Sequence, residues 1–140
     1  MIARTLAVLS LVLIAAPAFA ADKDQEALQG TWKIEKAVRG GMEMPAEMRD
    51  KVTLEFKGDE AIVHEPGKDE PATYTLDATK SPKTINIKPK KDEKQVQGIY
   101  ELSGDTLKIC FAREGGERPS KFESPEGSNL MLMEMKRVKK

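Results

Sequence analysis

The sequence has little of several features that would point to a function. It contains one cysteine, so an internal disulfide is excluded, and it contains one histidine. Basic and acidic residues number 23 each, and this balance gives no long-range attraction to nucleic acid or to an anionic membrane. The basic cluster at residues 88–94 is interrupted by two acidic residues, and we expect a solvated loop there. The apolar run 6–16 is shorter than the roughly 20 residues needed to span a bilayer.

A leader is expected at the start of the chain. Arg4 supplies a positive charge, the apolar run follows it, and Ala18-Phe19-Ala20 forms a small-x-small cleavage motif. This order is typical of a secretory signal peptide over residues 1–20, removed between Ala20 and Ala21. The mature chain, residues 21–140, is one domain by size, and we expect it to be exported to a periplasmic or extracellular compartment.

Short alternations of apolar and polar residues, separated by turn residues, run through the mature chain with almost no helical periodicity. This spacing predicts an all-β sandwich or barrel. Eight strands are expected, at 31–39, 52–57, 60–65, 72–77, 83–88, 95–103, 106–112 and 129–138. Eight strands suit an antiparallel up-and-down barrel, which removes its own edges by closing. One short helix is expected at Pro45–Lys51, between the first two strands, with its proline in the first turn.

Two hairpins with the same layout set the register of the predicted barrel. Each places a Gly-Asp pair in a two-residue turn, at 58–59 and at 104–105, where glycine accepts a positive φ at little cost. Counting outward from the turns, Phe56 faces Ala61 and Leu102 faces Leu107, so the apolar residues share one face. A slip of one residue would put a whole apolar row in water.

The same alternation extends the inward-facing row along the other strands. It adds Trp32, Ile34, Val38, Val52, Tyr74, Leu76, Ile85, Ile87, Val96 and Phe111. The outward parity holds Ile62, His64, Ile99 and Cys110. Because the inward residues are mostly large, this row favours a filled interior or a small cavity.

A Gly-X-Trp motif, within Leu28–Trp32, opens the first predicted strand, and Arg137 lies near the end of the last one. This pair resembles the calycin and lipocalin pattern, in which the Trp plugs one end of a small barrel and the Arg packs across it. The resemblance therefore implies that Trp32 and Arg137 form a barrel-closing pair. A guanidinium over an indole contributes about 0.5–2 kcal/mol, depending on burial.

A more specific similarity covers nearly the whole mature chain. It rests on the segments 28–32, 76–85 and 98–110, on Arg118-Pro119, on Phe122 with Ser124, and on Gly127-Ser128. On these residues the chain is similar to an uncharacterised exported lipocalin-like domain family abundant in planctomycete bacteria. The resemblance implies a lipocalin-like barrel of unknown function, and it carries over no catalytic residue and no cofactor.

Two classes of function remain open. The first is a binding module that takes a small apolar ligand at the barrel end opposite Trp32, under a lid formed by Met42–Lys51. Its possible pocket lining is Met42, Met44, Met48, Tyr74, Tyr100 and Phe111. The second is a packed barrel that acts as a structural or protein-interaction module. A contiguous apolar cavity of roughly 300 Å³ or more would favour the ligand.

Metal binding and catalysis have weaker support. Met131, Met133 and Met135 alternate along the last strand, and thioethers bind Cu(I), so a methionine-based copper site is a minor alternative. Methionine is also a common core filler, and no spacing links His64 to this row. His64 has no Ser or Cys nucleophile motif near it, and Cys110 is expected to pack beneath the long 113–128 loop. We expect neither a resident metal nor an enzymatic activity.

Overall fold

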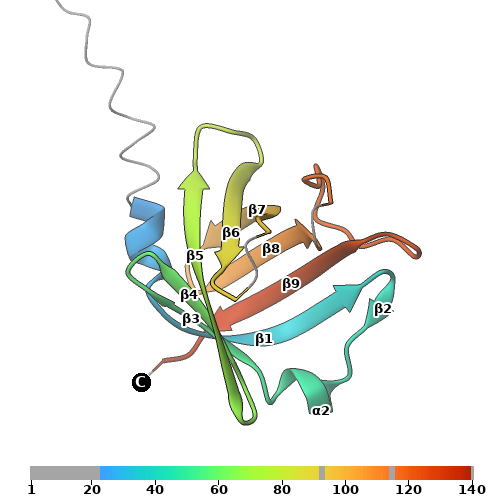
Figure 1. Cartoon of the computed structure of the whole chain (residues 1–140), viewed down its shortest axis with the longest axis horizontal. Helices are drawn as coiled ribbons and strands as arrows, with labels where there is room; N and C mark the ends of the chain where they lie inside the picture. The colour runs from blue at the N-terminus through green and yellow to red at the C-terminus, as the bar shows by residue number, and fades with distance from the viewer. Residues whose placement is uncertain (1–22, 92–93, 114–115, 140) are drawn as a thin grey trace, which may run out of the picture.

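The computed structural model describes residues 23–91, 94–113 and 116–139, and the expected leader at residues 1–20 lies outside them. The chain forms a closed antiparallel barrel of eight strands, with one further short strand and a short helix (Figure 1). The barrel strands are β1 (Gly30–Arg39), β3 (Thr53–Lys57), β4 (Glu60–Glu65), β5 (Lys68–Asp77), β6 (Lys83–Pro89), β7 (Val96–Ser103), β8 (Thr106–Ala112) and β9 (Leu130–Arg137). Strand β2 (Met42–Glu43) and helix α2 (Ala46–Arg49) lie between β1 and β3. The predicted eight-stranded barrel and its short helix are thus confirmed.

Barrel closure comes from the pairing of the first strand with the last. The sheet order runs from β1 through β3 to β9 in sequence, and β9 then pairs with β1. Strand β2 adds only a two-residue pairing beside β1. Because of this closure, each of the eight barrel strands pairs with a neighbouring strand on both of its sides.

The two predicted hairpins are confirmed with their register. Phe56 pairs with Ala61 across β3 and β4, and Leu102 pairs with Leu107 across β7 and β8. Gly104 has a φ of 59° at the second turn, in the left-handed region that other residues reach at a cost. Gly58, with a φ of 63°, has the same role at the first.

The connections between strands alternate between the two ends of the barrel, as the up-and-down order requires. The β3–β4, β5–β6 and β7–β8 turns lie at one end, which we call the closed end. The β1–β3, β4–β5, β6–β7 and β8–β9 connections lie at the other, which we call the mouth. A helical turn at 23–28, shown in blue in Figure 1, precedes β1 and so lies at the closed end.

One inward assignment from the sequence is wrong. The register of β1 against β9 shifts between Ile34 and Lys36, as a β-bulge does, so the side-chain alternation changes there. As a result Ala37, and not Val38, faces the main core. Val38 instead packs against a second apolar cluster formed by Ile99, Cys110 and Leu132.

This second cluster lies on the outer side of the barrel and is covered by residues 116–128, which we call the cover segment. Phe122 packs against the cluster, and the Cys110 thiol donates to the carbonyl of Glu123 at 3.3 Å. The Ser124 hydroxyl donates to the Leu130 carbonyl at 2.7 Å and accepts from the Gly40 amide at 2.7 Å. One face of β9 packs against the main core and the other against this second cluster, which explains why the last strand is apolar on both faces. Cys110 is buried beneath the cover segment, as expected.

Candidate functional site

The closed end is built around Trp32. Its side chain is fully buried, and the indole Nε1 donates to the carbonyl of Leu28 at 2.8 Å. The guanidinium carbon of Arg137 lies 4.4 Å from the centroid of the Trp32 ring. The same guanidinium donates to the carbonyls of Gln29, at 3.1 Å, and Ala27, at 2.6 Å. The two residues expected to close the barrel thus lie in contact, and Arg137 also holds the chain just before β1.

Two buried tyrosines direct their hydroxyls to this closed end. The Tyr100 hydroxyl donates to the Asp24 carboxylate at 2.7 Å, and the Tyr74 hydroxyl donates to the Gly58 carbonyl at 2.9 Å. Burial raises the pKa of Tyr74, and burial followed by the hydrogen bond to Asp24 raises the pKa of Tyr100. Phe56 packs edge-on against Tyr74 with ring centroids 5.1 Å apart. The large aromatic side chains are therefore concentrated at one end of the interior.

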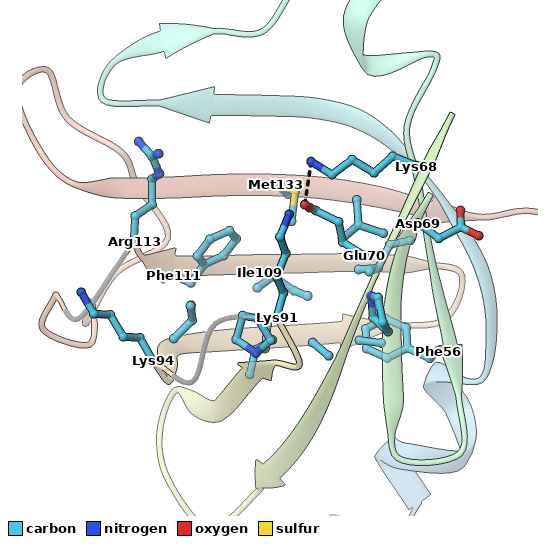
Figure 2. Close-up of a pocket in the computed structure, with 18 residues that line it drawn as sticks. Phe56, Lys68, Asp69, Glu70, Lys91, Lys94, Ile109, Phe111, Arg113 and Met133 are labelled. Carbon is cyan, nitrogen blue, oxygen red and sulfur yellow. Dashed lines mark ion pairs between the residues drawn. The ribbon is translucent and has the colours of Figure 1, made fainter. Parts of the chain in front are cut away.

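The other half of the interior is hollow. A cavity of about 820 Å³ opens at the mouth, and Figure 2 shows the side chains that surround it. Its apolar walls are Leu54, Phe56, Ala61, Val63, Pro71, Ala72, Ile87, Pro89, Val96, Ile109, Phe111 and Met133. This volume is well above the roughly 300 Å³ that favours a ligand, and it is within the range usual for small-molecule sites.

Small residues account for the hollow. Ala61 on β4 and Ala72 on β5 pair directly across the sheet, and both line the cavity where larger side chains would fill it. Gly98 on β7 has a different role: it pairs with Phe111, and because an added Cβ would lie 2.8 Å from the Cβ of Phe111, glycine lets this wall residue lie close to β7. The sequence favours a filled interior or a small cavity because most inward residues are large. The structure differs because those residues are unevenly distributed along the barrel axis.

Charged side chains form the rim of the cavity. The rim residues are Lys68, Asp69 and Glu70 on β5, Lys91 and Lys94 between β6 and β7, and Arg113 just after β8. Lys68 Nζ lies 2.9 Å from a Glu70 carboxylate oxygen, and Asp69 lies 2.8 Å from Nδ1 of His64. The second ring nitrogen of His64 lies 2.8 Å from Glu55. Hydrogen bonds to Glu55 and then to Asp69 raise the pKa of His64 above its usual value.

Of the six residues expected to line a pocket, the structure places one at the cavity. Phe111 is in the wall, whereas Tyr74 and Tyr100 are engaged at the closed end. Met42 and Met48 lie on β2 and α2 with exposed side chains, and Met44 packs against the main core. The expected lid at Met42–Lys51 therefore supplies no cavity lining, because α2 lies beside β1 and the rim is formed by other connections.

The methionines of the last strand lie in a row along the interior. Met135 is fully buried in the main core, Met133 lines the cavity, and Met131 packs against the same core. Alternate side chains on one strand are about 6.7 Å apart, so this row spreads along β9 and does not converge on one point. Within the described ranges, no group of three or more His, Cys, Asp or Glu is placed to hold a metal ion.

The rim is the part of the site that sequence reasoning missed. The basic cluster at 88–94 reads as a solvated loop in the sequence, yet Lys91 and Lys94 border the cavity. The strand order predicts this placement of Lys91 and Lys94, since the β6–β7 connection lies at the mouth in any up-and-down barrel of this order. Arg113 directly follows a strand that ends at the mouth, and the same reasoning would place it there.

Comparison with known proteins agrees with this geometry. A family model described as a lipocalin-like domain matches residues 28–109, which is more than half of the chain. The match begins at the buried Leu28 beneath Trp32 and ends in the cavity wall at Ile109. A search of curated proteins and a search of solved structures found no significant match. No described helix has the length and apolar character needed to cross a membrane. With its closed barrel and this match, the chain belongs to the lipocalin-like domain family.

Proposed function

We propose that this protein is an exported binding module that holds a small apolar molecule inside its barrel. The observation that carries the proposal is the cavity of about 820 Å³, whose walls are apolar and whose opening lies away from the Trp32 plug. Burying an apolar surface in such a space contributes about 25 cal/mol per Å² removed from water, before the cost of association is subtracted. The membership in a lipocalin-like family supports binding in general and names no ligand.

The proposed role is binding without catalysis. The histidine that could act as a base, His64, has both ring nitrogens held by carboxylates of Glu55 and Asp69. The thiol of Cys110 is fully buried outside the barrel interior, and burial raises its pKa, which opposes formation of the nucleophilic thiolate. These two placements support a site that retains its ligand unchanged.

A paired substitution on β5 tests the proposal. A lipophilic fluorophore is titrated into the purified mature protein, and its binding is followed by fluorescence. Ala72→Phe places a ring in the cavity and should weaken binding about tenfold or more, with the melting temperature retained or raised because the ring fills empty space. Thr75→Phe puts the same ring on an exposed position of the same strand and should leave binding unchanged. If the wild-type protein, Ala72→Phe and Thr75→Phe bind the fluorophore equally, the fluorophore lies outside the cavity and the proposal is contradicted.

Export is proposed from the leader alone. Residues 1–20 have the charge, apolar run and cleavage motif of a signal peptide. We expect N-terminal sequencing of the protein recovered from outside the cytoplasm to begin at Ala21. Recovery of a chain that still begins at Met1, in the cytoplasm, would contradict export.

A further inference from the structure

The charges around the mouth are unevenly arranged. Among the residues that the structure describes, the two rim carboxylates lie on β5 and both are engaged, Glu70 by Lys68 and Asp69 by His64. Figure 2 shows Arg113 and Lys94 on the opposite side of the opening, beside Phe111, with Lys91 between the two sides. In the described part of the rim, four cationic side chains thus accompany two carboxylates that already have partners.

Arg113 and Lys91 are the rim cations available to a ligand. Among the described residues, no carboxylate lies within ion-pair distance of either side chain. Arg113 follows Phe111 by two positions, so an apolar wall leads directly to a guanidinium. Arg113 is half-buried, and a charge partly removed from water attracts an opposite charge more strongly than an exposed one does. A guanidinium also matches the two oxygens of a carboxylate or phosphate.

We propose that the natural ligand is an anionic amphiphile, with an apolar body inside the barrel and a carboxylate or phosphate head at the mouth. The head is held by Arg113, with Lys91 contributing a second positive charge. This inference rests on the proposed function, because the apolar body occupies the cavity already described. It adds the charge class of the ligand and the orientation in which the ligand lies.

Probes with one chain and different heads test the charge class. Dodecanoate, dodecyl phosphate, dodecan-1-ol and dodecylammonium are each used, below their micelle concentrations, to displace the fluorophore. We expect the two anions to bind about tenfold more tightly than the alcohol, and the cation to bind most weakly. Added salt should reduce this difference, because part of the rim is exposed to solvent. The ranking of the two anions separates a fatty-acid-like ligand from a lipid-phosphate-like one.

Charge variants of the rim test the orientation. Arg113→Gln should weaken dodecanoate binding about fivefold and leave dodecan-1-ol unchanged. The matched control is Arg39→Gln, an exposed position on β1 outside the cavity lining, which should change neither affinity. Glu70→Gln removes a negative charge from the rim and should tighten dodecanoate binding. If Arg113→Gln fails to fold, Lys91→Gln carries the same test, with the exposed Lys57→Gln as its control.

Each outcome decides one point. Equal binding of dodecanoate and dodecan-1-ol by the wild-type protein would overturn the anionic head and leave the apolar binding module standing. If Arg113→Gln weakens the binding of dodecan-1-ol as much as it weakens the binding of dodecanoate, the assigned orientation is overturned. Failure of every probe to bind the folded protein would overturn the binding module, and this inference with it.

Discussion

At the scale of single residues, the barrel depends on a few side chains that satisfy several demands at once. Trp32 fills the closed end with its ring and uses its one polar atom on the Leu28 carbonyl. Arg137 covers the same ring and uses its remaining donors on two carbonyls ahead of β1 and on Asp105. Lys139 and then Arg137 lower the pKa of Asp105, so this carboxylate stays charged at the closed end.

The first prediction concerns Trp32. Trp32→Ala should lower the free energy of unfolding by about 3–5 kcal/mol, as expected for a large aromatic side chain deleted from a core. Urea denaturation followed by circular dichroism measures this loss. Ile62→Ala, on the outward face of β4 and only half-buried, is the control and should cost clearly less. A near-neutral effect of Trp32→Ala would mean that the closed end is not held by its plug.

The second prediction concerns the pH dependence of stability at His64. Its pKa is raised in the folded state, chiefly by the hydrogen bond to Glu55, so the charged ring stabilises the fold. This contribution is fully present below the unfolded pKa, about 6.5, and is lost as the pH rises through the higher folded value. The stability lost on His64→Gln should therefore be larger at pH 5.5 than at pH 9, measured by urea denaturation at each pH. An equal loss at both values would contradict the ion-pair geometry.

At the scale of elements, Arg118 anchors the beginning of the cover segment to the barrel wall. Arg118 donates to the carbonyls of Ile85, at 3.2 Å, and Gly98, at 2.7 Å. It also donates to the side-chain oxygens of Asn86, at 2.6 Å, and Gln97, at 3.2 Å. These bonds join strands β6 and β7 to a loop that follows β8. Together with the hydrogen bonds at Glu123 and Ser124, they hold the long connection against the barrel, where it covers the second apolar cluster.

The third prediction follows from this attachment. Arg118→Ala should lower the free energy of unfolding by about 2–3 kcal/mol, because it removes hydrogen bonds from a charged donor. It should also speed proteolytic cutting within residues 116–128, since the cover segment would detach before the barrel unfolds. Limited proteolysis followed by mass spectrometry locates the cuts. Arg39→Ala, at an exposed position, should change stability by less than about 0.5 kcal/mol and leave the cleavage pattern intact.

How well an element can be predicted from the sequence depends on how local its cause is. The hairpins around Gly58 and Gly104 are set by their own turn residues and alternation, and their register was predictable. The bulge after Ile34 depends on pairing with β9, about a hundred residues away in sequence, so strict alternation along β1 puts Val38 on the wrong face. The helical turn at 23–28 is too short for a periodic signal, and its packing against the closed end is a tertiary effect.

The candidate site was less predictable than the fold for the same reason. The barrel-closing pair carries a motif, and its two members lie in contact. The cavity has no motif, because it depends on where small residues such as Ala61 and Ala72 meet across neighbouring strands. Its rim depends on which connections meet at one end. That information is present in the strand order but not in the composition of any single loop.

At the scale of the whole molecule, the two ends of the barrel differ in structure. The closed end holds the aromatic plug and the hydrogen bonds of Trp32, Tyr74 and Tyr100, and the mouth holds the cavity and the charged rim. The residues just before β1 belong to the closed end. Leu28 is almost fully buried, and Asp24 accepts hydrogen bonds from Tyr100 and from Lys83, the latter at 2.9 Å. The proposed cleavage after Ala20 leaves all of these contacts in the mature chain.

The fourth prediction tests whether this N-terminal turn is part of the fold. A chain that begins at Ala21 retains Asp24 and Leu28, whereas one that begins at Gly30 loses both, together with the acceptor for the Trp32 indole. The shorter chain should be less stable by about 3 kcal/mol or more, because it loses a buried leucine and leaves the indole N–H without its partner. Leu28→Ala in the longer chain separates the two effects, since it removes the side chain and keeps the carbonyl. Urea denaturation of the three proteins measures the losses, and the emission of Trp32, the one tryptophan of the chain, should shift to longer wavelength in the shorter form. Equal stability of the two chain lengths would show that the barrel closes without the turn and that Trp32 is held by Arg137 and the strands alone.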